Sequence, residues 1–159
     1  MEIRRADPHD YEGARAVQQA TFPREDRYDY ASSCRRHDCI SFVAIENDRI
    51  IGFVSILVNY YTPNPVHVWE LLSPYVGFIG VLPEFQGRHV GEKLLQTAVD
   101  LVLKQLRRPR LWLECLEKNM EFYEKNGFVR ASPERVRKET GLTPKGPVYC
   151  IEGDDHSAI

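Results

Sequence analysis

One stretch of the chain, residues 75–106, constrains the fold more than any other. It opens with a strand pattern that Gly77 and Gly80 interrupt, and apolar residues recur at three- and four-residue spacing from Val90 to Leu106. The latter spacing is typical of one face of an amphipathic helix. Between the two lies a short glycine-containing loop, residues 86–91. The stretch predicts a strand, a tight loop and a helix, and the strand glycines predict a bulge or a close backbone approach.

The remaining sequence alternates strand and helix patterns. Asn47-Asp48 separates two β-branched runs, which predicts a hairpin of antiparallel strands. Between Thr21 and Asp38 we expect a loop and then a short second helix from about Tyr28, and the prolines of residues 62–74 argue against regular structure there. The other expected strands are residues 2–6, 111–115, a run starting at 128, and 148–151; the other helices are 11–20 and 120–126; and 131–146 is expected to be a polar connection.

Length and composition indicate one compact domain. The chain has 159 residues, of which 43% are hydrophobic, enough to bury a sizeable core. We detect no repeat, low-complexity tract or second domain. A single domain is therefore expected over residues 1–153, followed by a flexible tail at 154–159.

Charge and cysteine usage argue against several classes of partner and against a metal site. The net charge of −2 gives no broad basic field, so neither nucleic acid nor a membrane is expected as a partner. The cysteines lack a C-x-x-C pair or a nearby histidine, which argues against a metal site. No signal peptide or apolar run of about 18 residues is found. A cytoplasmic protein with free thiols is expected.

The loop of residues 86–91 has the features of an anion site. It precedes the strongest predicted helix, whose first N–H groups have no partner within the helix and lie at the positive end of its dipole. Gly87 and Gly91 allow a ligand to approach the backbone closely, and Arg88 adds a charged donor. Taken alone, the segment favours an ordinary strand-to-helix turn, because a short glycine motif is weak evidence for a site.

Two motifs that follow one another along the chain favour an anion site in this loop over an ordinary turn. Residues 86–91 match a Q/R-x-x-G-x-G/A pattern at Gln86 and Gly91, and residues 122–128 match an F-Y-x-K-x-G-F pattern. In the order and spacing of these motifs, over about residues 40–130, the chain resembles the GNAT superfamily of N-acetyltransferases. The resemblance implies an α/β fold with a mixed, mostly antiparallel sheet of six or seven strands, splayed at the cofactor site and flanked by about four helices.

The sequence departs from the family pattern at two places. His89 stands where the pattern usually has glycine. Because a positive φ would cost a histidine about 1 kcal/mol or more, we expect a negative φ there, with the amide still available. Many relatives also carry an asparagine about seven residues before the tyrosine of the second motif, where this chain has Leu116. Asn119 takes that role here, or the role is absent.

The resemblance implies acetyl-CoA as the acetyl donor, no metal, and direct attack by an amine in a ternary complex. Tyr123 occupies the family's general-acid position, and Glu70 and Glu114 are candidates for the base that deprotonates the amine. The backbone around Val81 would hold the pantetheine arm and face the thioester carbonyl. The full set of expected cofactor-binding residues is Ile79, Gly80, Val81, Gln86, Gly87, Arg88, His89, Val90, Gly91, Asn119 and Phe122.

The acceptor stays open at this stage. Residues 113–123 are similar to glucosamine-6-phosphate N-acetyltransferases, whereas residues 22–27 resemble a segment of aralkylamine acetyltransferases. We therefore expect a primary amine, on a small molecule or a peptide. Dimers are common among such proteins, so a homodimer is a further expectation. The alternative function is a non-catalytic module that binds or senses acyl-CoA.

Overall fold

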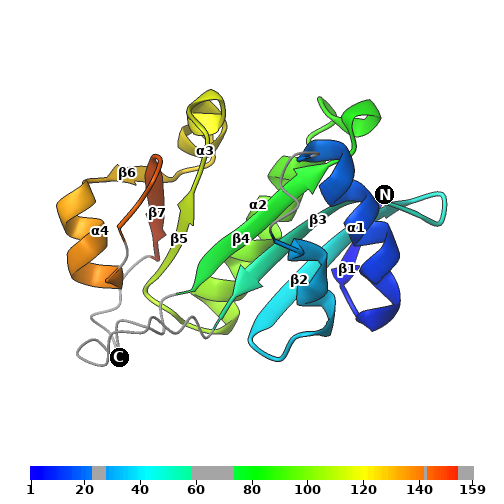
Figure 1. Cartoon of the computed structure of the whole chain (residues 1–159), viewed down its shortest axis with the longest axis horizontal. Coiled ribbons are helices and arrows are strands. Elements are labelled where there is room, and N and C mark those ends of the chain that lie inside the picture. Colours follow the sequence, from blue (N-terminus) through cyan, green and yellow to red (C-terminus); the bar gives the residue numbers. More distant parts are fainter. Residues whose placement is uncertain (23–27, 59–73, 142, 154–159) are drawn as a thin grey trace. The chain divides into compact units, whose positions relative to one another are not determined.

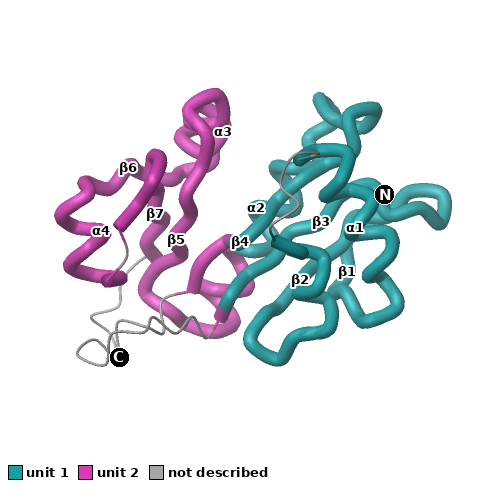
Figure 2. The backbone as a smooth tube through the Cα atoms, in the orientation of Figure 1, with its two compact units in different colours: residues 1–57, 77–98 teal, residues 58–76, 99–159 magenta. Residues whose placement is uncertain are grey.

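The computed structural model describes residues 1–22, 28–58, 74–141 and 143–153. The chain forms two compact units, coloured separately in Figure 2. Unit 1 consists of residues 1–57 and 77–98, and unit 2 consists of residues 58–76 and 99–159.

The described residues contain seven strands and four α-helices (Figure 1). The strand order is β1-β2-β3-β4-β5-β7-β6, and the sheet is not closed. This confirms the expected α/β class. The strands are β1 (Glu2–Arg5), β2 (Cys39–Glu46), β3 (Arg49–Leu57), β4 (Tyr75–Val81), β5 (Arg110–Glu114), β6 (Val129–Ala131) and β7 (Val148–Glu152), and the helices are α1 (Tyr11–Thr21), α2 (Val90–Asp100), α3 (Met120–Lys125) and α4 (Pro133–Thr140).

Unit 1 is built on the β2–β3 hairpin. Its turn residues Asn47 and Asp48 have φ angles of 51° and 61°, the left-handed pair that matches the twist of a two-residue hairpin. The predicted hairpin is thus confirmed, and β1 pairs antiparallel with its outer strand β2. The core of this unit lies between the sheet and its helices, with Ala14 and Val17 of α1 and Leu94 of α2 fully buried.

The glycines of β4 make room for neighbouring side chains. A Cβ atom added at Gly80 would lie 2.8 Å from the ring of Phe78, and one added at Gly77 would lie 2.7 Å from Leu57 Cδ1. A side chain at Gly80 would have to displace the Phe78 ring, whereas one at Gly77 would have to displace only the end of the Leu57 side chain. The approach expected from the sequence is real, but side chains rather than backbone make it at these two positions.

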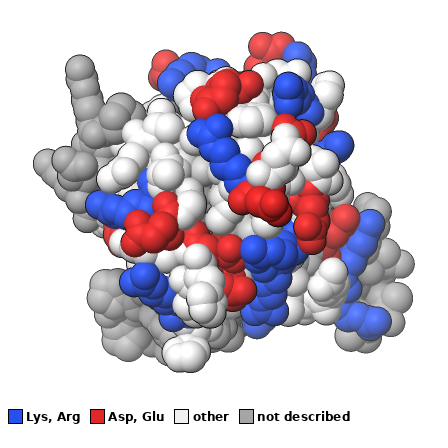
Figure 3. All heavy atoms as spheres, turned by 90° about the vertical axis from the view of Figure 1, so that its right-hand side faces the viewer, with Lys and Arg blue, Asp and Glu red and all other residues white. Residues whose placement is uncertain are grey.

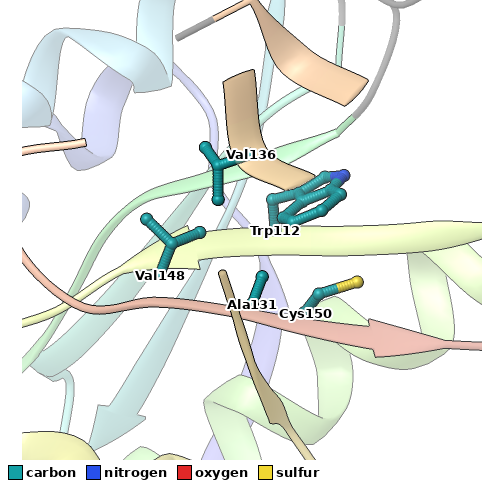
Figure 4. Close-up of a cluster of buried hydrophobic side chains, with 5 residues drawn as sticks. All are labelled: Trp112, Ala131, Val136, Val148 and Cys150. Atoms are coloured by element: carbon teal, nitrogen blue, oxygen red, sulfur yellow. The ribbon is translucent and has the colours of Figure 1, made fainter. Parts of the chain in front are cut away.

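Unit 2 centres on the antiparallel strands β5, β7 and β6. The first two residues of β4 pair with β5 in parallel, Tyr75 with Trp112 and Val76 with Leu113. Figure 4 shows Val136 of α4 packed with strand residues around the Trp112 ring. The residues of this buried cluster are Trp112, Ala131, Val136, Val148 and Cys150, with Tyr75 packed against them.

Helix α4 corrects the expectation of a polar connection at residues 131–146. The side chain of Ser132 accepts a hydrogen bond from the Arg135 amide at 3.2 Å, Pro133 follows it, and Gly141 ends the helix with φ = 74°. These are standard start and stop signals. The prediction was wrong because the charged sequence between them shows only one apolar side chain to the core, Val136.

Two other helices differ in form from the prediction. The helix expected to run to Leu106 is α-helical to Asp100 and then widens into a π-helical turn at Leu101–Gln105, in which the Leu106 amide bonds to the Leu101 carbonyl at 2.8 Å. The short second helix is a 3₁₀ helix, Tyr30–Arg35.

Some expectations fall on other parts of the chain. The irregular stretch at 62–73 and the tail at 154–159 lie outside the described residues. In the described part, no helix combines the length and apolarity that crossing a membrane requires.

Candidate functional site

The loop after β4 in unit 1 is held in a fixed shape by its own residues. A 3₁₀ turn at Pro83–Phe85 leads into it. The Gln86 side chain then reaches back, and its Nε2 donates to the Val81 carbonyl at 3.0 Å. The sequence predicted Gln86 as a cofactor contact, and the structure shows that its amide group closes the loop onto the end of the strand.

The expected negative φ at His89 was wrong. Gly87 and His89 both have left-handed backbones, with φ angles of 80° and 63°. Histidine adopts this region more often than most residues, and here its Nδ1 lies 2.8 Å from Glu92 Oε2, one turn into α2. Glycine, which the pattern quoted above usually has at this position, adopts this conformation without steric cost.

This backbone leaves a run of donors without partners. Among the residues that the structure describes, the N–H groups of residues 87–92 donate no hydrogen bond, and the Lys93 amide is the first to bond, to the His89 carbonyl at 3.1 Å. Residues 86–89 are exposed. Successive free amides at a helix N-terminus form a concave site for anions such as a pyrophosphate.

The charged side chains around the loop are paired with carboxylates. Arg88 Nη1 lies 3.1 Å from Glu46 Oε2, and Arg49 Nη2 lies 3.1 Å from Glu84 Oε1. Both guanidinium groups also stand over the Phe85 ring. On the face drawn in Figure 3, positive and negative side chains are accordingly interspersed. In this conformation the free backbone amides, rather than the paired guanidinium groups, are the donors that face an anion without first breaking an ion pair.

The other predicted cofactor contacts of unit 1 lie in or beside β4 and α2. Ile79 is half-buried, whereas Gly80 and Val81 are buried. Beyond the strand, the Leu82 amide bonds to the Ile51 carbonyl of β3 at 2.8 Å, which ties the start of the loop to the sheet. Val90 is buried and Gly91 half-buried at the first turn of α2.

Tyr123 is the buried centre of the predicted catalytic region in unit 2. It is 6% exposed, and its ring makes edge contacts with Phe122 and Phe128 at centroid distances of 5.1 and 6.0 Å. Within the described chain its hydroxyl has no hydrogen-bond partner. Burial, and then the nearby Cys115, raise the pKa of Tyr123 well above its ordinary value, so it is protonated at neutral pH.

The residues before Tyr123 form a short lead-in to α3. Asn119 is half-buried at the N-cap of the helix, and its side chain makes no cap hydrogen bond. The backbone N–H of Asn119 instead donates to the Leu116 carbonyl at 2.9 Å. Leu116 is 50% exposed and has no polar group to replace an asparagine. Phe122 is half-buried against Tyr123.

Glu114, a candidate base, has a structural partner that the sequence did not reveal. Its Oε1 accepts hydrogen bonds from the amides of Lys145 and Gly146, each at 2.6 Å. The carboxylate thereby fixes the connection between α4 and β7 beside the end of β5. No local pattern could have predicted this contact, because the partners are about thirty residues apart. Glu70, the other candidate base, lies outside the described residues.

The structure thus groups the predicted residues into two sets. Ile79 to Gly91 lie together in unit 1, and Glu114, Asn119, Phe122 and Tyr123 lie together in unit 2. Sequence reasoning missed one member of the second set, Tyr149, whose hydroxyl donates to Glu124 Oε1 at 2.8 Å. In the parts that the structure describes, no cluster of His, Cys, Asp or Glu has a geometry suited to a metal ion.

A family model and a curated relative both match this chain to acetyltransferases. The model of the acetyltransferase (GNAT) family matches residues 3–128. A curated relative, N-alpha-acetyltransferase 30 of Schizosaccharomyces pombe, is 34% identical over 93 residues, which span 57% of each chain.

Solved structures share the fold at lower identity. The ribosomal-protein-S18-alanine N-acetyltransferase of Escherichia coli superposes with a TM-score of 0.72 at 20% identity, covering 99% of this chain and 97% of that one. Arabidopsis thaliana NAA60, solved with a bisubstrate analogue, gives a TM-score of 0.70 at 14% identity, covering 96% and 99%.

Proposed function

Because this chain belongs to the acetyltransferase (GNAT) family, we propose that it is an N-acetyltransferase that transfers the acetyl group of acetyl-CoA to a primary amine. The observation that carries the proposal is the row of free N–H groups at residues 87–92, which is suited to the pyrophosphate of coenzyme A. Gly87 and Gly91 let the phosphates approach the backbone, and Gln86 keeps the loop closed on β4.

The pantetheine arm would lie along the end of β4. Backbone groups of Ile79 to Val81 can pair with its amides as an added strand would. An N–H group near Val81 would then face the thioester carbonyl and stabilise the negative charge that develops on its oxygen during attack. The side chains of this segment matter less than its backbone.

Tyr123 is proposed as the general acid. The amine nitrogen attacks the thioester carbon directly in a ternary complex, the C–S bond breaks, and the sulfur leaves as a thiolate. A phenol with a raised pKa stays protonated at neutral pH, so it can donate a hydrogen bond to the sulfur as negative charge accumulates there. The raised pKa also makes the phenol a weaker acid, so the full transfer of its proton to the thiolate costs free energy. In a buried place this hydrogen bond is stronger than it would be in water.

Two carboxylates, Glu114 and Glu70, are proposed as the base that deprotonates the amine. Glu114 could act only through Oε2, directly or through water, because Oε1 already accepts two amides. Glu70 is the second proposed base. Each would take the proton that the ammonium must lose before its nitrogen can attack.

Among primary amines we place a peptide α-amine first. A lysine-like ammonium has a pKa of about 10.4 and needs strong help from a base, whereas an α-amine, at about 7.7–8.0, is partly neutral at pH 7. An acceptor that deprotonates easily suits a site whose candidate base is engaged elsewhere. The name of the yeast relative also refers to α-amine acetylation, although this chain spans just over half the length of that protein. Amino sugars and aralkylamines are the other acceptors to test.

The four cysteines are free, which fits a reducing compartment such as the cytoplasm.

The test is release of free thiol from acetyl-CoA by the purified protein. The amine panel contains peptides with a free α-amine, an N-terminally blocked lysine peptide, glucosamine 6-phosphate, tryptamine and spermidine. We expect release with one acceptor class, reduced about 10²-fold or more by Tyr123→Phe with little change in the affinity for coenzyme A. Tight binding of coenzyme A without release from any amine would instead support the non-catalytic alternative.

A further inference from the structure

Tyr149 carries a hydroxyl in a place where core packing alone does not require one. It lies in β7, is 1% exposed, and pairs across the sheet with Leu113 and Arg130. A phenylalanine would fill nearly the same volume without a polar atom to satisfy. The hydroxyl avoids the cost of an unpaired buried donor by bonding to Glu124 Oε1 at 2.8 Å.

This hydrogen bond reaches the residue next to Tyr123. Both Tyr123 and Glu124 belong to α3, which has six residues and is too short to be stable without outside contacts. The Tyr149 ring also lies against the Tyr123 ring, at a centroid distance of 6.4 Å. Tyr149 therefore contacts α3 at two adjacent residues, by its ring and by its hydroxyl.

Two adjacent contacts fix the rotation of a helix about its axis. Successive side chains project about 100° apart, so neither contact can be kept if α3 turns appreciably. A tyrosine hydroxyl stands about 8 Å from the axis of its helix, and a rotation of about 10° would move it by about 1.4 Å. A misplacement of about 1 Å can lower a rate about 10²-fold. The direction of the Tyr123 hydroxyl thus depends on this pair.

We propose that Tyr149 and Glu124 are positioning residues that aim the Tyr123 hydroxyl. The inference rests on the proposed role of Tyr123 as general acid. In this role Tyr149 and Glu124 act through Tyr123 and need no contact with the substrate or the leaving sulfur. Removing either end of their hydrogen bond therefore lowers the turnover number and spares the Michaelis constant for acetyl-CoA.

Four variants test the pair. In thiol release with the amine panel above, Tyr149→Phe and Glu124→Ala each lower kcat about 10-fold or more, with the KM for acetyl-CoA within about twofold of wild type. Glu124→Gln keeps an oxygen that accepts the same hydrogen bond and restores kcat. The double variant Tyr149→Phe/Glu124→Ala is no slower than the slower single variant, because both remove one interaction. Glu124 is exposed, so its variants keep the core intact.

Hydrogen exchange supplies a readout that needs no acceptor. Amides of residues 120–128 exchange faster in Tyr149→Phe and Glu124→Ala, and at the wild-type rate in Glu124→Gln. Tyr11→Phe is the matched control, because the Tyr11 hydroxyl also donates to a carboxylate, Asp29, at 2.6 Å, but in unit 1. It leaves exchange at 120–128 and kcat unchanged.

The outcomes separate this inference from the proposed function. Wild-type kcat in Tyr149→Phe and Glu124→Ala, in a protein that Tyr123→Phe inactivates, overturns the positioning role and leaves the general acid standing. Full activity of Tyr123→Phe overturns the general-acid role of Tyr123 and the inference that rests on it, whereas the absence of thiol release from every amine overturns the proposed function. Unchanged exchange at 120–128 in both Tyr149→Phe and Glu124→Ala overturns the inference whether or not an acceptor has been found.

Discussion

At the scale of single residues, His89 shows how strongly the loop imposes its backbone. A left-handed conformation costs a non-glycine residue about 1–2 kcal/mol, and the Glu92 contact offsets part of that cost for histidine. The conformation persists because residues on both sides fix it. Gln86 holds the loop to β4, and α2 begins at Val90.

Substitutions at His89 should follow this backbone preference. We expect the free energy of unfolding of His89→Gly to exceed that of His89→Ala by about 1 kcal/mol. His89→Val should be the least stable of the three variants, because a β-branched side chain is strongly disfavoured at positive φ. Urea denaturation measures the order. Equal stability of the valine and glycine variants would contradict the left-handed conformation. The same glycine variant should bind coenzyme A at least as tightly as wild type.

The sequence predicted the elements that carry the candidate site more reliably than the contacts of single residues. The loop between β4 and α2 and the short helix α3 follow from local patterns, because consecutive residues define a turn or a short helix. The φ angle of His89 was missed because it depends on how the loop closes, and a residue type alone does not determine that. The partners of Glu114 and Tyr149 were missed because each pair joins distant parts of the chain.

At the scale of elements, the strands and the main helices could be predicted because their signals are periodic. The β2–β3 hairpin and α2 have long apolar patterns, whereas α4 contributes one core side chain, Val136, and depends on its ends. Periodicity could not detect α4, but the serine, proline and glycine at its boundaries could have. The π-helical turn after α2 had no such signal in the sequence.

The cap of α4 should therefore matter more than its interior. Ser132→Ala removes the hydrogen bond to the Arg135 amide and should destabilise the protein by about 1 kcal/mol. Ser132→Asp supplies another oxygen acceptor and should retain most of the stability. Thermal unfolding of the three proteins checks both statements. If Ser132→Ala unfolds at the same temperature as the wild type, the cap contributes nothing to the stability of the fold.

At the scale of the whole molecule, the reactivity of the cysteines shows whether the fold is intact. Cys34, Cys39 and Cys150 are buried, and burial raises the pKa of each thiol to about 11. Only the thiolate reacts with disulfide reagents, and at pH 8 about one in a thousand of such thiols is ionised. Cys115 is half-buried, and its thiol pKa is also raised, again mainly by burial.

We expect Cys115 to react first in the native protein and all four cysteines to react in urea. The slow native reaction of the other three should follow the rate of opening of the fold. A Cys115→Ser variant should lose the first phase alone. Rapid titration of three or more thiols without denaturant would show that these side chains are not protected. The same measurement gives the background for the thiol-release assay.

The path of the chain between the two units limits how this protein can be recombined. The chain passes from unit 1 to unit 2, back to unit 1 and again to unit 2, and two of these passages fall inside β4 and α2. Neither unit is one contiguous stretch of sequence. A gene fragment cut at either passage would interrupt a strand or a helix, so the halves cannot be exchanged with those of a relative as cassettes.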